Sequence, residues 1–283
     1  MQSSNFQRGV QLFELGRYPE AISYFSQDME QWDNRYMLAQ SYYQNGDLKK
    51  ASSLTNGLLE EAPENPNVFF LKSQIALQQD RDKEALQYIN EALAFNPYDA
   101  DFFGLKGAIL LQFKKYGEGL VAINEGLAID PKNNFCLNTR AQLLTKLDRK
   151  QEAAYTVEDI LLDNPEEAYS HANVGWVALE NNQLDKALTH FKEALRYNPN
   201  FEYAREGMSK TLKAKNFIYR SYLKYEFWIA KQSSKNQWIF IIGIYIAYRI
   251  GLKALNASGL TFLAIPLILS LIHILTLPTI LLV

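Results

Sequence analysis

Apolar residues recur along residues 1–200 at spacings of three and four, which is the period of a helix with one buried face. The pattern divides into pairs of helices of about a dozen residues each, and the clearest pair covers about Tyr169 to Glu180 and Leu184 to Tyr197. One such pair cannot bury its apolar face alone, so neighbouring pairs must stack on one another. The pattern therefore predicts an all-α solenoid.

Four series of residues recur in this region at one constant interval, the distance from Pro63 to Pro97, which we call the repeat step. Prolines end successive repeats, because the residue before a proline avoids helical geometry. Leucines precede the prolines, and two series of small residues mark the places where paired helices cross. The series are Pro63, Pro97, Pro131, Pro165 and Pro199; Leu59, Leu93, Leu127, Leu161 and Leu195; Ala51, Ala85, Gly119, Ala153 and Ala187; and Ala39, Ser73, Gly107, Ala141 and Gly175. Gly119 shows that small size is needed there, since glycine costs about 1 kcal/mol of helix propensity relative to alanine.

These residues carry a family resemblance. The spacing of Gly175, Leu184, Ala187, Phe191, Ala194, Leu195 and Pro199 resembles the tetratricopeptide repeat, as does that of Gly9, Leu15, Gly16, Tyr18, Ala21 and Phe25. The tryptophan near the start of the family motif is absent from every repeat, and the first repeat is shorter than the others. The resemblance implies an α-solenoid of about six helix-turn-helix repeats over residues 1–200, followed by a capping helix.

The resemblance also implies that the first helix of each repeat lines a concave groove that binds protein partners. The side chains expected there are mostly aromatic or amide: Phe6, Phe13, Tyr36, Gln40, Tyr43, Gln44, Phe70, Gln74 and Trp176. Such a surface suits an extended or helical peptide bound by stacking and backbone hydrogen bonds. Some relatives hold an acidic chaperone tail with cations in this groove, and we do not expect that ligand because those positions are uncharged here. Alternatively, the aromatic rings pack against the neighbouring repeat as core.

Charge divides the chain into two parts. Residues 1–204 hold 19 Lys and Arg against 29 Asp and Glu, a net charge of −10, whereas residues 205–283 hold 10 against 2, a net charge of +8. Within residues 201–236, basic side chains alternate with aromatic ones, and the expected contacts are Lys210, Lys213, Lys215, Arg220, Lys224, Trp228 and Lys231. This composition is typical of a membrane surface. A capping helix without lipid is the alternative, and nucleic acid is not expected because a hydrophobic segment follows directly.

Two hydrophobic segments end the sequence, at residues 237–256 and 259–283. The first carries Arg249 and Lys253, and the second is free of charged residues from Leu260 to Val283. At about 1.5 Å per residue the second is long enough to cross a bilayer of about 30 Å. We therefore predict a transmembrane helical hairpin, with a buried core helix as the alternative for each segment. The excess of cations before the first segment predicts a cytoplasmic repeat domain.

The segment after the repeats also resembles that of uncharacterised bacterial membrane-anchored tetratricopeptide proteins. The residues that carry this likeness are Ala204-Arg205-Glu206-Gly207, Leu212-Lys213-Ala214-Lys215, Tyr219-Arg220, Trp228 and Trp238. It implies a bacterial inner or cell membrane, although similar layouts also occur in eukaryotic organelle receptors. The start of the chain has no apolar run of signal-peptide length, so we do not expect export of the repeats.

Few residues could carry catalysis. The chain has three histidines and one cysteine, Cys136; His171 and His190 fall on different helices of the sixth repeat, and His273 falls in the second hydrophobic segment. We expect no catalytic residue, metal, cofactor or small-molecule substrate. The leading hypothesis is a membrane-anchored scaffold that recruits a protein partner to the bilayer. The alternatives are a constitutive structural subunit of a membrane complex, and an accessory subunit of an enzyme or transporter in which His273 serves a proton path.

Overall fold

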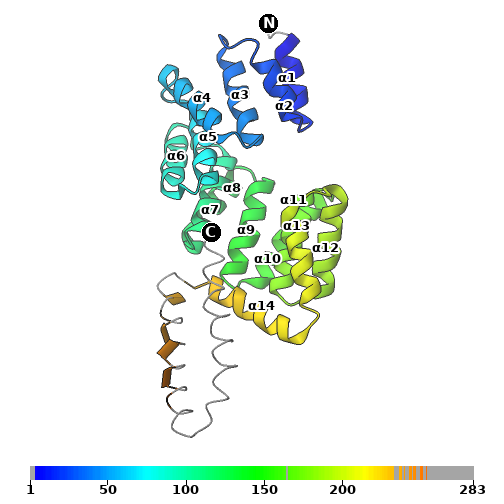
Figure 1. The fold of residues 1–283 in the computed structure, drawn as a ribbon. Coiled ribbons are helices and arrows are strands. Elements are labelled where there is room, and N and C mark those ends of the chain that lie inside the picture. Colours follow the sequence, from blue (N-terminus) through cyan, green and yellow to red (C-terminus); the bar gives the residue numbers. More distant parts are fainter. Residues whose placement is uncertain are drawn as a thin grey trace. The chain divides into compact units, whose positions relative to one another are not determined.

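The computed structural model describes residues 4–163 and 165–232, together with scattered positions between 236 and 253. This part of the chain is all-α (Figure 1). Its fourteen helices are α1 (Ser4–Glu14), α2 (Tyr18–Phe25), α3 (Trp32–Gln44), α4 (Leu48–Glu61), α5 (Pro66–Gln78), α6 (Asp82–Phe95), α7 (Ala100–Gln112), α8 (Tyr116–Ile129), α9 (Asn134–Lys146), α10 (Lys150–Asp163), α11 (Ala168–Glu180), α12 (Leu184–Tyr197), α13 (Glu202–Lys213) and α14 (Phe217–Ala230).

The chain divides into two compact units, residues 1–215 and 216–283. In the first unit each odd-numbered helix from α1 to α11 packs on the even-numbered helix that follows it, and successive odd-numbered helices from α1 to α13 also contact one another. The odd-numbered helices therefore form one layer of a stack of helix pairs. The predicted tetratricopeptide solenoid is confirmed.

From the second helix pair (α3 and α4) to the sixth (α11 and α12), each pair turns at an equivalent residue in the left-handed region of backbone space. These residues are Gly46, Asp80, Lys114, Asp148 and Asn182, with φ between 57° and 82°. They follow one another at the repeat step and close the odd-numbered helices, since a left-handed residue commonly ends a helix. Several helices begin at a side-chain cap; for example, Asn65 Oδ1 accepts from the backbone N–H of Asn67 at 3.0 Å.

The small residues lie where helices approach closely, as expected. A Cβ atom added to Gly119 would lie 3.0 Å from Cδ2 of Leu143 and 3.3 Å from the backbone oxygen of Gly107. At Gly126 the added atom would lie 2.8 Å from Sγ of Cys136 and 2.9 Å from Cβ of Phe103. Small size is therefore the requirement at these positions, because well-packed interiors do not accommodate an extra methyl group without movement.

The prediction that the fold includes a transmembrane helical hairpin is wrong. Across the described residues, none of the helices is both long and apolar enough to span a membrane. The predicted first span at 237–256 includes Arg249 and Lys253, and a charge near the centre of a span costs about 3 kcal/mol. The predicted second span at 259–283 lies outside the described residues, as does His273. The fold class is corrected to an all-α tetratricopeptide solenoid.

Candidate protein-binding surface

The layer of odd-numbered helices carries equivalent side chains in columns, one from each repeat. One column contains Gln40, Gln74, Ala108, Gln142, Trp176 and Lys210, and a second contains Gln44, Gln78, Gln112, Lys146 and Glu180. Contacts between neighbouring members, such as the ion pair of Lys146 and Glu180, show that the columns run across adjacent helices. We call the surface formed by these two columns and the aromatic side chains beside them the odd-helix face.

Two of the predicted groove residues lie in the first repeat and pack within it. The ring of Phe6 meets that of Phe25 edge-on at 5.8 Å between centroids, and Phe13 meets Tyr18 in the same way at 5.5 Å. Both Phe6 and Phe13 are half-buried and flank the core cluster of Leu12, Ala21, Phe25 and Leu38. Both rings therefore pack within the first repeat, and each keeps part of its surface exposed.

Tyr36 is held on three sides. Its ring stacks on Trp32 at 5.4 Å, its hydroxyl donates to the backbone oxygen of Asn67 at 3.4 Å, and the hydroxyl accepts from Nε2 of Gln40 at 3.2 Å. Burial raises the pKa of Tyr36 to about 12 and also raises the pKa of Tyr43. Tyr36 thus joins the second repeat to the third while it keeps part of its surface accessible.

The rings of the next repeats are also largely structural, whereas the amides face solvent. Phe70 stacks on Phe102 of the following repeat at 5.1 Å. Gln74 is half-buried, and Gln44, Gln78 and Gln112 are exposed. The exposed part of this half of the face is therefore a column of uncharged amides, and the aromatic rings act mainly as its support.

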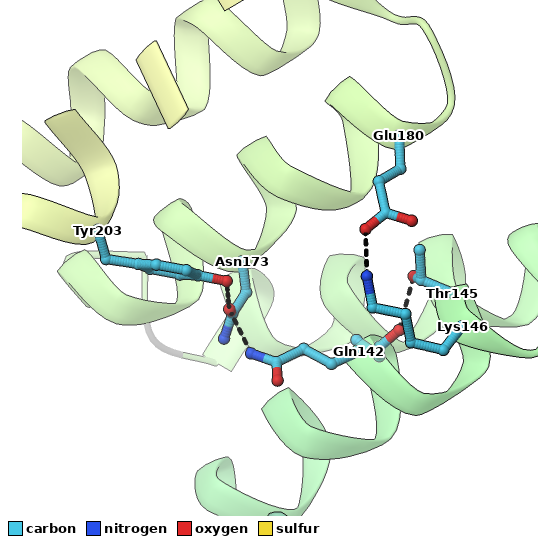
Figure 2. Close-up of polar contacts among 7 residues, drawn as sticks. Gln142, Thr145, Lys146, Asn173, Glu180 and Tyr203 are labelled. Carbon is cyan, nitrogen blue, oxygen red and sulfur yellow. Dashed lines mark hydrogen bonds and ion pairs between the residues drawn. The ribbon is translucent and has the colours of Figure 1, made fainter. Parts of the chain in front are cut away.

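A hydrogen-bonded network joins three odd-numbered helices farther along the face (Figure 2). Oδ1 of Asn173 accepts from Nε2 of Gln142 at 2.8 Å and from the hydroxyl of Tyr203 at 3.3 Å. Nδ2 of Asn173 donates to Oδ1 of Asn138 at 2.9 Å, and Nδ2 of Asn138 donates to Oγ of Ser170 at 3.0 Å. Asn173 and Asn138 are almost completely buried, so these bonds satisfy groups that would otherwise be costly.

An ion pair lies beside this network. Nζ of Lys146 on α9 is 2.8 Å from Oε1 of Glu180 on α11 (Figure 2). Burial lowers the pKa of Lys114, and the charge of nearby Lys146 lowers it further. The second column thus changes from exposed amides to a partly buried charge pair along the stack.

An aromatic cluster closes the face at α11 and α13. Trp176, the last predicted groove residue, stacks on Tyr203 at 5.4 Å and donates from Nε1 to the Tyr203 backbone oxygen at 3.3 Å. Tyr169 stacks on Tyr203 at 6.3 Å and lies 6.2 Å from Phe201. Tyr203 was absent from the expected groove set, although it follows Tyr169 by one repeat step.

The structure divides the predicted basic-aromatic set between the two compact units. Lys210, Lys213 and Lys215 belong to the first, and Arg220, Lys224, Trp228 and Lys231 belong to the second. In α14 the side chain of Leu223 is buried. Phe217, Ile218, Tyr225 and Trp228 are exposed, by 73%, 77%, 40% and 43% respectively. This helix therefore presents apolar surface with cations interspersed.

The possible chemistry of the described residues is limited. Among them, there is no group of three or more His, Cys, Asp or Glu side chains that could hold a metal ion. Burial raises the pKa of the Cys136 thiol to about 12, which opposes a reactive thiolate. Nδ1 atoms of His171 and His190 lie 3.1 Å apart, and Nε2 of His171 lies 2.9 Å from the backbone oxygen of Pro165. A backbone oxygen only accepts, so Nε2 of His171 donates to Pro165, and the two Nδ1 atoms share one hydrogen bond.

Comparisons with known proteins agree with this fold. A family model described as "Anaphase-promoting complex, cyclosome, subunit 3" matches residues 21–92, and a tetratricopeptide repeat model matches residues 168–201. No curated protein matches the chain. These two models and the solved structures below support a tetratricopeptide repeat protein, a fold that suggests a protein-protein interaction scaffold.

Several solved structures share the fold. A hetero-tetramer of the anaphase-promoting complex, Cut9-Hcn1, matches with a TM-score of 0.64 and 18% identity over 74% of this chain, which spans only 42% of the matched chain. A tetratricopeptide repeat protein from Parabacteroides merdae matches with a TM-score of 0.64 and 19% identity, over 74% of this chain and 83% of that one. A thermophilic tetratricopeptide repeat protein from Thermus thermophilus matches with a TM-score of 0.60 and 16% identity, over 64% of this chain and 99% of that one. At such identities the likeness shows the fold alone.

Proposed function

We propose that this chain is a protein-protein interaction scaffold whose odd-helix face binds an extended segment of a partner protein. The observation that carries the proposal is the column of exposed amides Gln44, Gln78 and Gln112, which recurs at the repeat step on adjacent helices. Amide side chains both donate and accept hydrogen bonds, so a row of them suits the backbone of an extended peptide. Repeat stacks characteristically use such extended surfaces for binding.

The rigidity of the face supports this function. The bonds of Asn173 to Gln142 and Tyr203 connect α9, α11 and α13, and the Tyr36 hydroxyl connects α3 to α5. A surface that is already ordered loses less conformational entropy when a partner binds.

Affinity capture tests the proposal with two matched triple variants. The first replaces Gln44, Gln78 and Gln112 with alanine, and the control replaces the exposed amides Gln87, Asn90 and Asn124 of the even-numbered helices α6 and α8. All six side chains are exposed, so both variants are expected to fold like the natural chain. A partner lost by the first variant and kept by the control supports the proposal. A partner kept by the first variant, or lost only by the control, contradicts it.

A second function is supported by a separate observation, the exposed apolar side chains of α14. We propose that Phe217, Ile218 and Trp228, together with the cations Lys224 and Lys231, contact an anionic lipid surface peripherally. Aromatic and basic side chains favour the headgroup region, and each cation contributes about 1 kcal/mol near an anionic surface. No membrane-spanning segment is part of this proposal.

Sedimentation with vesicles tests this second function. The full chain is expected to bind vesicles of phosphatidylcholine with phosphatidylserine more strongly than phosphatidylcholine alone, and more weakly as salt increases. Replacing Phe217, Ile218 and Trp228 with serine should abolish binding. Replacing Leu15, Val121 and Tyr155 of the first compact unit, which are 69%, 60% and 69% exposed, with serine should not. Equal loss from both variants, or binding that ignores vesicle charge, would contradict the proposal.

A further inference from the structure

The aromatic cluster of Tyr169, Trp176, Phe201 and Tyr203 has features that the binding of a peptide backbone does not require. Tyr169 lies at the start of α11 with 42% of its surface exposed. Its ring stacks on Tyr203, and Tyr203 in turn stacks on Trp176. The cluster therefore offers an accessible aromatic ring that is backed by further rings.

This cluster already attracts a cation. Nζ of Lys210, one repeat step beyond Trp176, lies 5.6 Å from the centroid of the Trp176 ring and 3.3 Å from Oε1 of Glu206. An ammonium group at such a distance from an aromatic face is stabilised by the ring quadrupole. The contact places an ammonium group over the Trp176 ring and beside the Glu206 carboxylate.

The surrounding charges act in the same direction. Burial raises the pKa of Tyr203, and the charges of Tyr169, Glu180 and Glu206 raise it further. Glu180 is also paired with Lys146, and Glu206 with Lys210. Glu166 and Glu202, near the starts of α11 and α13, are exposed. Residues 1–215, the first compact unit, hold 23 Lys and Arg against 30 Asp and Glu, a net charge of −7. A cationic ligand is thus favoured at short range by aromatic faces and at long range by the solenoid.

The position of Tyr203 is fixed from beneath. Its hydroxyl donates to Oδ1 of Asn173, which also accepts from Gln142, so the ring is tied to the network that joins α9, α11 and α13 (Figure 2). The Nε1 atom of Trp176 is bonded to the backbone of Tyr203. The stack of rings is therefore ordered before any ligand arrives.

We propose that Tyr169 and the rings behind it bind an arginine or lysine side chain of the partner segment. The guanidinium of arginine fits better, because it is planar and stacks on an aromatic ring while its N–H groups reach carboxylates. This inference rests on the proposed function and specifies the chemistry of the partner at one end of the odd-helix face. A basic residue of the partner lies over Tyr169, and the rest of its extended segment follows the amide column.

Binding of labelled peptides to the full chain tests this inference. Three short peptides of equal length, built from glycine, serine and alanine, are compared; they contain two arginines, two glutamates or no charge. The arginine peptide is expected to bind most tightly. Tyr169→Leu should weaken its binding about five- to tenfold, whereas Tyr169→Phe, which keeps the aromatic face, should retain it.

Tyr155→Leu is the matched control, because Tyr155 is an exposed tyrosine on the even-numbered helix α10. It should leave the affinity for the arginine peptide unchanged. Equal affinity for the three peptides, or equal binding by Tyr169→Leu and Tyr169→Phe, would overturn the inference. The capture experiment with the Gln44, Gln78 and Gln112 variant remains a separate readout, so failure of the arginine site is distinguishable from failure of the binding face.

Discussion

Lys146 and Glu180 occupy the same position in consecutive repeats, and their Nζ and Oε1 atoms lie 2.8 Å apart. The pair connects α9 to α11 next to the buried network of Asn138 and Asn173. The side chain of Lys146 is 26% exposed and that of Glu180 is 9% exposed. Salt therefore screens this pair less than it screens a surface ion pair. Its energetic role is therefore open to a direct test.

Removing one charge of this pair is expected to destabilise the chain. Glu180→Met leaves the ammonium of Lys146 half-buried without its carboxylate and should lower the free energy of unfolding by about 1–3 kcal/mol. The double variant Lys146→Met with Glu180→Met should recover most of this loss, because no unpaired charge remains. Urea unfolding of the natural chain, the two single variants and the double variant measures the coupling. Additive effects of the two single substitutions would contradict the expectation.

Substitution by alanine should have different effects on stability at two glycines of α8. Gly126→Ala places a Cβ atom 2.8 Å from Sγ of Cys136 and 3.2 Å from the backbone oxygen of Ala100, and should cost about 1–3 kcal/mol. Gly117→Ala meets nothing within 4 Å and should leave stability unchanged or raise it by up to about 1 kcal/mol. Thermal unfolding compares the two variants. A stable Gly126→Ala protein would show that the helices can separate at this crossing.

The His171–His190 contact predicts a stability that depends on pH. Burial, followed by the charges of His171 and Lys186, lowers the pKa of His190 to about 4, whereas an unfolded histidine titrates near 6.5. The folded chain therefore favours the neutral ring. The contribution to stability is present above about pH 6.5 and is lost as the pH falls towards 4.

The His190→Gln variant isolates this contribution from the carboxylates that titrate in the same range. The difference in unfolding free energy between the natural chain and the variant should shrink as the pH falls from about 6.5 to 4. NMR titration of His190 should report the lowered pKa directly. A His190 pKa near 6.5 would refute this interpretation of the contact.

Cys136 should react slowly in the folded chain. Its thiol is buried, and its pKa of about 12 leaves little thiolate at pH 8. Alkylation by iodoacetamide should be at least tenfold slower in the folded chain than in urea, since the thiolate is the reactive form. Because this pKa is raised, burial of the neutral thiol makes its full contribution to the unfolding free energy below about pH 8.5. That contribution is lost as the pH rises towards about 12. Rapid alkylation of the folded chain would show that α8 and α9 open at this point.

The helical repeat could be predicted from the sequence because its determinants are local and periodic. The repeat step identifies the helix pairs, and the same step locates the left-handed turns at Asp80, Lys114, Asp148 and Asn182. The need for small residues at Gly119 also followed from the pattern alone. These features depend on helix geometry and steric contact within a repeat.

The exposure of individual rings could not be predicted in the same way. Phe70 and Tyr169 both lie on odd-numbered helices, yet Phe70 packs on Phe102 of the next repeat whereas Tyr169 keeps 42% of its surface. The difference depends on which side chain the neighbouring repeat supplies. Tyr203 was not among the expected groove residues because it lies on the capping helix, beyond the last full repeat.

The transmembrane hairpin was predicted from segment length and average hydrophobicity. These properties do not establish that a continuous apolar helix forms, and the described residues include no helix that could span a membrane. The basic-aromatic pattern before the segments has a structural counterpart in the exposed Phe217, Ile218 and Trp228 of α14. What those side chains contact stays a prediction for the vesicle experiment.

Site-specific photocrosslinking tests the central claim most directly, because it reports which face a partner touches. A photoreactive residue is placed at Gln78 on the odd-numbered helix α5, and in a second protein at Asn124 on the even-numbered helix α8. Both positions are exposed, so neither substitution should disturb the fold. We expect crosslinks to the captured partner from position 78 and none from position 124. Crosslinks from position 124 alone would contradict binding on the odd-helix face.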